Sequence, residues 1–192
     1  ELSRYRDRYS EVSGNVLPEE YLRQALVYQF YKGYRPVAGF ILNTVNWSPL
    51  RYFSYLDETI RQTLLFEEDL IESDFLEITS NWKSSELSSS ESHTYYSVML
   101  KQAQRQARLY GKKLLLGGSV IKPIKKLQQR LMTRIIYHGP IDPQRRNTVK
   151  EKQPLLKLYI VPVAQVRWRA AISLWKRYLG LVFRTILAKK KI

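Results

Sequence analysis

Apolar residues recur along this chain in two patterns, one spaced as on a helix face and the other continuous or alternating as in a strand. An apolar and aromatic run spans residues 25–31, and a second run spans residues 35–44 after the turn-like Lys32-Gly33-Tyr34. Two such runs around a short glycine-containing turn predict a β-hairpin. Gly39, inside the second run, indicates a bulge or a close approach of backbone.

The middle of the chain predicts a strand, a helix and a second strand in succession. Residues 74–82 alternate as in a strand, residues 94–110 have amphipathic helical spacing closed by Gly111, and residues 113–118 form a short apolar run. The predicted fold class is α/β or α+β, with a mixed central sheet flanked by helices. The other expected elements are a helix or extended arm at 4–13, helices from Leu17, over 57–72 and from Ser119 to about Met132, and strands at 134–139 and 154–163.

Charge divides the chain into two unlike parts. Residues 1–92 contain nine Lys and Arg against 15 Asp and Glu, a net charge of −6. Residues 93–192 contain 23 Lys and Arg against two acids, a net charge of +21. A domain needs a net charge of only about 2–8 to stay soluble. The basic part therefore predicts contact with an anion such as nucleic acid, an anionic membrane surface or a phosphate-rich ligand like coenzyme A.

Composition limits the classes of protein that remain. The absence of cysteine excludes a disulfide scaffold and thiolate chemistry. His93 and His138 lack metal-ligand spacing, so no metal site is expected. No apolar run has membrane-spanning length and no signal peptide is recognised, which makes a cytoplasmic protein the default expectation. The length fits one domain over residues 1–163, followed by a basic amphipathic helix over residues 164–192.

Two basic segments are candidates for binding partners. The expected helix from Ser119 carries cations at i, i+3 and i+4 spacing, which suits contacts to phosphates, and more cations follow it. The C-terminal helix places Trp and Phe on one stripe among eight cations between Arg167 and Lys191, without an acid. That pattern fits a helix in a membrane interface, a helix that docks on a protein partner, or a C-terminal helix packed on the core. The candidate residues are Lys122, Lys125, Lys126, Arg130, Arg145 and Arg146 for anion or nucleic-acid binding, and Trp168, Trp175 and Phe183 for a membrane or partner.

Three segments resemble the GNAT N-acyltransferase family. The run Arg35-Pro36-Val37-Ala38-Gly39-Phe40-Ile41-Leu42 resembles the second hairpin strand of that family, and Phe75-Leu76-Glu77-Ile78-Thr79 resembles the central strand that ends at the acyl-CoA site. Tyr137-His138-Gly139 is similar to a Tyr-x-Gly that follows a later helix. The likeness follows the order of elements over about residues 20–163. It implies a GNAT-like fold and acyl-CoA-dependent N-acyl transfer, with Glu77 as general base and Tyr137 as general acid.

One motif of the family is replaced in this chain. Where the family has a basic-x-x-Gly-x-Gly loop for the pyrophosphate, residues 83–92 are rich in serine, lack glycine and include Glu86 and Glu91. Serine hydroxyls and the start of the next helix can still bind an anion, but the two carboxylates oppose it, so we expect weak binding of acyl-CoA or none. The candidate cofactor-binding residues are Thr79, Ser88, Ser89, Ser90, Ser92 and Thr94.

Three functional classes therefore remain open from the sequence. The first is an acyltransferase-related protein that uses acyl-CoA or has lost its activity. The second is a non-enzymatic protein that binds nucleic acid through its basic half. The third is a peripheral membrane protein or complex-assembly protein that docks through its C-terminal helix.

Overall fold

The computed structural model describes residues 2–44, 46–120, 128, 133–142 and 155–166. The basic residues Lys122, Lys125, Lys126, Arg130, Arg145 and Arg146 lie outside the described residues. So do Trp168, Trp175 and Phe183 and nearly all of the expected C-terminal helix. The predictions made for these side chains therefore stay predictions.

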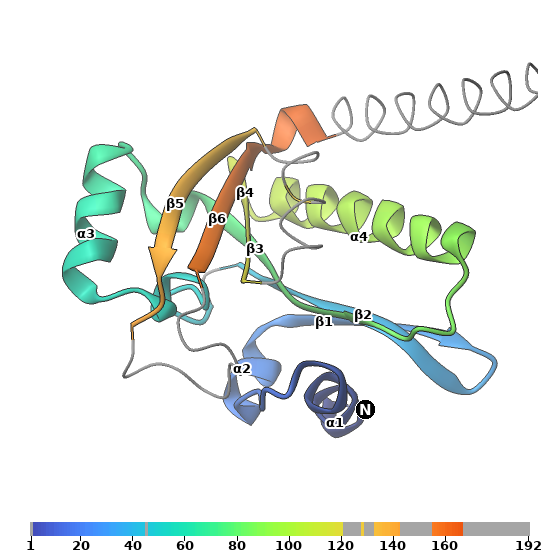
Figure 1. The fold of residues 1–192 in the computed structure, drawn as a ribbon. Coiled ribbons are helices and arrows are strands. Elements are labelled where there is room, and N and C mark those ends of the chain that lie inside the picture. Colours follow the sequence, from blue (N-terminus) through green and yellow to red (C-terminus); the bar gives the residue numbers. More distant parts are fainter. Residues whose placement is uncertain (1, 45, 121–127, 129–132, 143–154, 167–192) are drawn as a thin grey trace, which may run out of the picture.

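A six-stranded mixed sheet forms the centre of the molecule, in the order β1-β2-β3-β4-β6-β5. β3 and β4 are parallel, and the other neighbouring pairs are antiparallel (Figure 1). The predicted hairpin is confirmed as β1 and β2, and the predicted fold class is confirmed by the mixed sheet with its helices. The strands are β1 (Leu26–Lys32), β2 (Arg35–Asn43), β3 (Phe75–Lys83), β4 (Leu114–Ser119), β5 (Arg134–Pro140) and β6 (Leu155–Pro162).

Helix α4 (Ser89–Leu109) connects the parallel strands β3 and β4, as a parallel pair requires. Its end is a Schellman motif, in which Gly111, at φ +63°, donates to Arg108 O and Lys112 donates to Ala107 O. Its start was predicted too late. The helix begins at Ser89 because Ser88 and Glu91 form a capping box, so the second half of the predicted serine-rich loop is helical.

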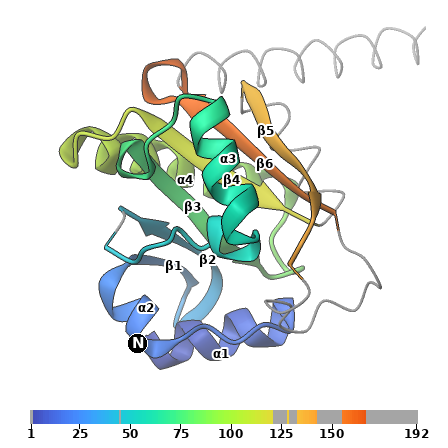
Figure 2. The same ribbon diagram turned by 90° about the vertical axis from the view of Figure 1, so that its left-hand side faces the viewer.

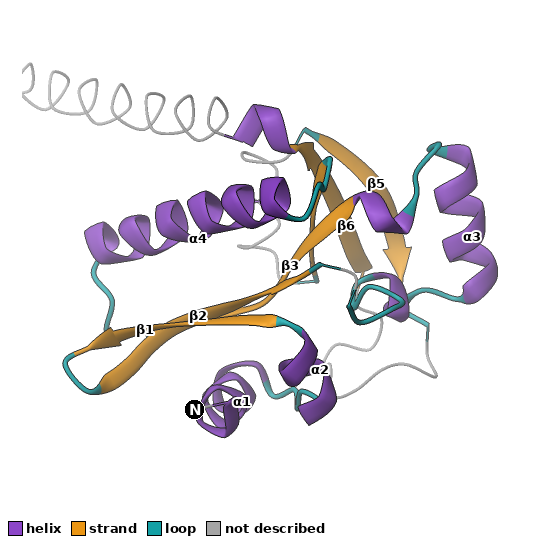
Figure 3. Ribbon diagram, turned by 180° about the vertical axis from the view of Figure 1, so that it is seen from behind, coloured by secondary structure: helices purple, strands orange, loops and turns teal. Residues whose placement is uncertain are grey.

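Helices cover both faces of the sheet. Figure 3 shows α4 on one face and α1 (Leu2–Ser13) and α2 (Glu19–Gln24) on the other. The face opposite α4 is also covered by the 3₁₀ turn Phe53–Tyr55 and by α3 (Glu58–Glu67), seen in front of the sheet in Figure 2. Neighbouring residues on β4 show the division: Leu115 packs in the cluster under α4, whereas Leu116 packs with Phe53 and Phe75.

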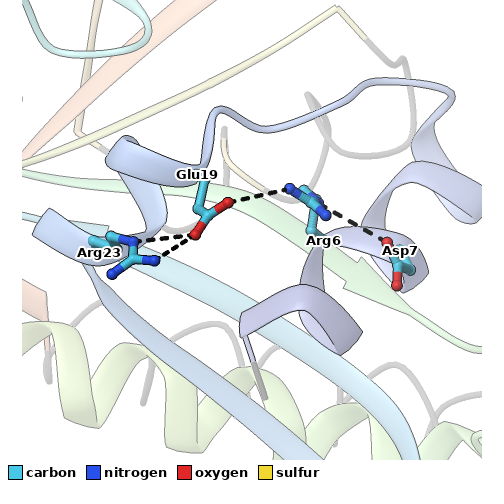
Figure 4. Close-up of polar contacts among 4 residues, drawn as sticks. All are labelled: Arg6, Asp7, Glu19 and Arg23. Atoms are coloured by element: carbon cyan, nitrogen blue, oxygen red, sulfur yellow. Dashed lines mark hydrogen bonds and ion pairs between the residues drawn. The ribbon is translucent and has the colours of Figure 1, made fainter.

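Helix α1 is held in place by its buried tyrosines. The side chain of Tyr5 is 0% exposed, and its hydroxyl donates to the carbonyl of Ser80 at 2.6 Å. Its ring also packs edge-on against Trp82. On the surface, Arg6 of α1 reaches Glu19 of α2 at 3.9 Å (Figure 4), but exposed ion pairs of this kind add little stability. The helix or extended arm predicted for this segment is therefore a helix that docks through aromatic burial.

Gly39 allows the close approach predicted for it. A Cβ atom there would lie 2.6 Å from Tyr5 Cε2 and 2.8 Å from both Trp82 Nε1 and Tyr28 O. Because one of these neighbours is backbone, it cannot swing aside, and we expect Gly39→Ala to lower the free energy of unfolding by about 2 kcal/mol. Gly33→Ala measures the cost of a positive φ without a clash, about 1 kcal/mol, since φ is +60° and a Cβ there meets nothing within 4 Å. Urea denaturation should show the larger loss at Gly39, and equal losses would contradict this packing.

Candidate functional site

The parallel strands β3 and β4 separate towards their C-terminal ends. They pair from Phe75↔Leu114 to Ile78↔Gly117, after which β3 continues to Lys83 and β4 to Ser119 without pairing to each other. A bulge in β3 accompanies the separation, because Ile41 and Gly39 of β2 pair with Thr79 and Trp82 of β3. The strand pairing therefore leaves a V-shaped split between β3 and β4.

Within the bulge, Ser80 has φ +49°, an uncommon value for a residue other than glycine. The Ser80 carbonyl accepts from Tyr5, whereas its own hydroxyl is buried and has no hydrogen-bond partner among the described residues. Strained residues of this kind persist where the surrounding structure holds them, and they gather at functional sites. The conformation supports the split as the candidate site.

Tyr52 lies across the beginning of the split. A Cβ atom at Gly118 of β4 would lie 2.9 Å from Tyr52 Cδ1, so the ring packs directly on that glycine. Its backbone N–H donates to the carboxylate of Glu77 on β3 at 2.6 Å, and burial raises the pKa of the Tyr52 hydroxyl. Tyr52 thus bridges both strands at the point where their pairing ends.

Glu77 lies on β3 and is 0% exposed. One carboxylate oxygen accepts from the Tyr52 N–H at 2.6 Å. The other accepts from the Arg51 N–H at 3.1 Å and from Asn43 Nδ2 at 3.4 Å. Burial raises the Glu77 pKa to about 7 against the opposing effect of these donors. Glu77 therefore holds residues 51 and 52 over the split, and it titrates near neutral pH, as a general base would.

Tyr137 does not meet Glu77 in this fold. It lies on β5, which is separated from β3 by β6 and β4. Its hydroxyl donates to the carbonyl of Pro140 at 2.7 Å, and its ring lies against Gly139. Neighbouring strands are spaced by about 4.8 Å, so three strand steps separate Tyr137 from the strand that carries Glu77. The role of general acid stays a prediction that this geometry does not support.

The serines predicted to bind a cofactor gather at the start of α4, and Thr79 lies apart on β3. Ser88, Ser89, Ser90 and Ser92 and also Thr94 lie in or next to its first turns. Ser88 Oγ accepts from the Glu91 N–H at 3.2 Å, and a Glu91 oxygen accepts from the Ser88 N–H at 2.8 Å. The carboxylate of Glu91 thus already occupies the start of the helix.

The hairpin tip strengthens that arrangement. Lys32 Nζ lies 2.9 Å from a Glu91 oxygen and, together with Ser88, lowers the Glu91 pKa to about 2. Arg35 pairs with Glu86 at 3.1 Å. Both carboxylates that the sequence predicted to oppose a diphosphate are therefore held by cations of the hairpin tip, next to the start of α4.

Two residues of the site were missed in the sequence. Residues 46–54 lie between the segments predicted as helices and strands, and neither Arg51 nor Tyr52 was singled out. Loops carried by a rigid scaffold often bear functional side chains, so a basic residue next to an aromatic one in such a loop was the available signal. Their position depends on Glu77, which is distant in sequence.

A membrane-spanning helix was not found within the described ranges, where no helix is both long and apolar enough. The described part of the chain also contains no group of three or more His, Cys, Asp or Glu side chains placed to hold a metal ion.

Comparisons of sequence found no matching family model and no matching curated protein. Comparisons of structure did find neighbours. FeeM, an N-acyl amino acid synthase from uncultured soil microbes, superposes with a TM-score of 0.57 at 12% identity, covering 88% of this chain and 92% of FeeM.

Two further solved structures are also similar over most of their length. The IAA acetyltransferase of Bacillus cereus has a TM-score of 0.51 at 13% identity, with 80% of this chain and 89% of that chain covered. The protein yncA of Salmonella typhimurium, solved with its cofactor acetyl-CoA, has a TM-score of 0.50 at 10% identity. The match covers 84% of this chain and 86% of yncA. These similarities extend over most of each chain, and this protein therefore has a divergent form of the GNAT acetyltransferase fold.

Proposed function

We propose that this protein is an acyltransferase that moves an acyl group from a pantetheine thioester to an amine. The observation that carries the proposal is the separation of β3 from β4 beyond Ile78 and Gly117. Past that point the backbone of β3 pairs with β2 on one side but not with β4 on the other. An extended chain with amide groups, such as a pantetheine arm, can add to an open strand edge through main-chain hydrogen bonds.

The reaction itself needs few groups from the protein. The amine attacks the thioester carbonyl, a C–N bond forms, the C–S bond breaks, and the thiol leaves while the amine loses a proton. Glu77, with its pKa near 7, is the proposed acceptor of that proton. The N-acyl amino acid synthase and the acetyltransferases among the structural neighbours support this class of reaction.

The start of α4 does not fit the diphosphate of acyl-CoA. Its N-cap serine already accepts from Glu91, and the carboxylates of Glu86 and Glu91 lie where the diphosphate would bind. Like charges repel each other, so these carboxylates would oppose a diphosphate. We therefore propose that the pantetheine arm supplies most of the donor affinity and the nucleotide little.

The test compares S-acetyl-pantetheine with acetyl-CoA and a longer acyl-CoA. We expect thiol release from all three in the presence of amines, and no tighter binding of the CoA esters in calorimetry. The double variant Glu86→Gln with Glu91→Gln should bind acetyl-CoA roughly tenfold more tightly, a difference of about 1.4 kcal/mol, because the repulsion is removed. Glu20→Gln, on the exposed surface of α2, is the matched control.

Two results would decide against these proposals. Failure of all three thioesters to bind or to release thiol would overturn the acyltransferase assignment. Tight binding of acetyl-CoA to the native protein, unchanged in the double variant, would show that Glu86 and Glu91 do not oppose the diphosphate.

A further inference from the structure

The Arg51 side chain is enclosed by tyrosine rings. Its guanidinium carbon lies 5.8 Å from the ring centre of Tyr21 and 5.7 Å from that of Tyr55. The Arg51 cation in turn opposes the effect of burial on the pKa of Tyr55. These contacts favour the cation and fix its place, but a guanidinium has five N–H donors and most of them have no acceptor in these contacts.

Arg51 differs from the other partly buried arginines of the described chain. Arg6 lies near Asp7 and Glu19, Arg8 pairs with Glu11 at 2.6 Å, and Arg61 pairs with Glu58 at 2.6 Å. Arg51 forms no ion pair with any described carboxylate. Neighbouring tyrosines and Glu77 keep the pKa of Arg51 above its usual range in spite of its burial, so the side chain stays a cation whose N–H groups can bind an anion.

Glu77 does not fill that position. It is close enough for Arg51 to lower its pKa, but its oxygens accept from the N–H groups of Arg51 and Tyr52 and from the Asn43 amide. The carboxylate therefore binds the backbone of residue 51, and the side chain of that residue remains available.

A second unused group belongs to one of the two tyrosines whose rings contact the guanidinium. Tyr21 is 1% exposed, and its hydroxyl is buried without a hydrogen-bond partner among the described residues. Burying such a group unpaired costs about 1–3 kcal/mol. The cation and the hydroxyl donor together suit a carboxylate, which accepts two parallel N–H bonds from a guanidinium and can take a further donor.

We propose that Arg51, with the Tyr21 hydroxyl, binds the carboxylate of the acyl acceptor, so that the acceptor amine belongs to an amino acid. This step rests on the proposed acyl transfer for the identity of the ligand as acceptor. Arg51 directly precedes Tyr52, which bridges β3 and β4 where the thioester arm is proposed to lie. A carboxylate held at Arg51 would keep its amine beside that split.

The experiment measures binding without turnover. Each of the L-amino acids is titrated into the full-length protein, beside its C-terminal amide, which keeps the amine and the side chain but lacks the negative charge. We expect at least one amino acid to bind with millimolar affinity or better, and its amide to bind at least tenfold more weakly. Arg51→Gln should bind that amino acid at least tenfold more weakly than the native protein does. Tyr21→Phe should weaken the binding by a smaller factor.

Arg8→Gln is the matched control, because Arg8 is also partly buried but already has Glu11 as a partner. The Arg8→Gln variant should bind the amino acid as tightly as the native protein does. Equal binding of amino acid and amide, unchanged binding in Arg51→Gln, or no binding of any amino acid to the native protein would overturn the inference. If circular dichroism shows that Arg51→Gln does not fold, the comparison of amino acid with amide on the native protein decides.

Acyl-transfer assays separate this inference from the function on which it rests. Equal transfer to amino acids and to amines without a carboxylate, unchanged in Arg51→Gln, would overturn the inference and keep the acyltransferase. Amino-acid binding that depends on Arg51, without transfer from any thioester, would keep the carboxylate site and overturn the acyltransferase.

Discussion

Replacing Tyr5 by alanine should lower the free energy of unfolding by about 4 kcal/mol, because it empties a large, fully buried site. The ring is 0% exposed, packs against Trp82 and occupies the space over Gly39, and its hydroxyl binds the Ser80 carbonyl. Tyr5→Phe removes only the hydroxyl and should cost about 1 kcal/mol. Chemical denaturation of the two variants separates the contributions of ring and hydroxyl.

Tyr34→Ala provides the control for the loss of a tyrosine as such. Tyr34 is 100% exposed at the hairpin tip, so its removal should leave stability nearly unchanged. If Tyr5→Ala were no more destabilising than Tyr34→Ala, α1 would not be docked on the sheet as the structure has it.

Glu77 should make the protein less stable as pH rises towards neutrality. Its ordinary pKa is 4.5, and burial raises the folded-state pKa to about 7. Between these values the unfolded state has lost a proton that the folded state keeps, so the free energy of unfolding falls as pH rises and levels off above pH 7. The full change is about 3 kcal/mol, at 1.36 kcal/mol for each pKa unit.

The measurement is urea denaturation from pH 4.5 to 8 of the native protein and of Glu77→Gln. Glutamine cannot titrate, so the difference between the two curves should contain the Glu77 contribution. Glu20→Gln, at an exposed position, should keep the native slope. Identical pH dependence in the native protein and Glu77→Gln, or a difference of opposite sign, would contradict the raised pKa.

The same residue requires care in tests of catalysis. Because Glu77 accepts from the backbone of residues 51 and 52, its replacement can displace Arg51 and Tyr52 as well as remove a base. Loss of activity alone would not distinguish these effects. A pH profile of kcat/KM with an inflection near pH 7 in the native protein would identify the proton acceptor.

The order of elements could be read from the sequence because its signals are local. The glycine turn between two apolar runs predicted the hairpin. The run ending near Trp82, the glycine-closed helix and the apolar run at 114–118 predicted a parallel pair with a helical connection. Each of these signals lies within a few residues of the structure it predicts, whereas the split between β3 and β4 was found only in the structure.

The composition of the site depended on contacts between distant parts of the chain. Glu77 was named as a base, but only folding brings the N–H groups of Arg51 and Tyr52, 26 and 25 residues away, onto its oxygens. Tyr137 was paired with it by resemblance, yet the strand order β3-β4-β6-β5 keeps the two apart.

The sequence by itself determined the strands, the helix that connects the parallel pair, their order and the unequal charge of the two halves, since these follow from periodicity, turn residues and composition. Only the tertiary structure decided that Tyr5 is a core residue, that Glu91 closes the start of α4 with the help of Lys32, and that Arg51 is enclosed by tyrosines without a carboxylate partner among the described residues. The physical reason is that the burial and pairing of a side chain depend on neighbours that are distant in sequence. Tyr5 and Ser80 are 75 residues apart, and Lys32 and Glu91 are 59 residues apart.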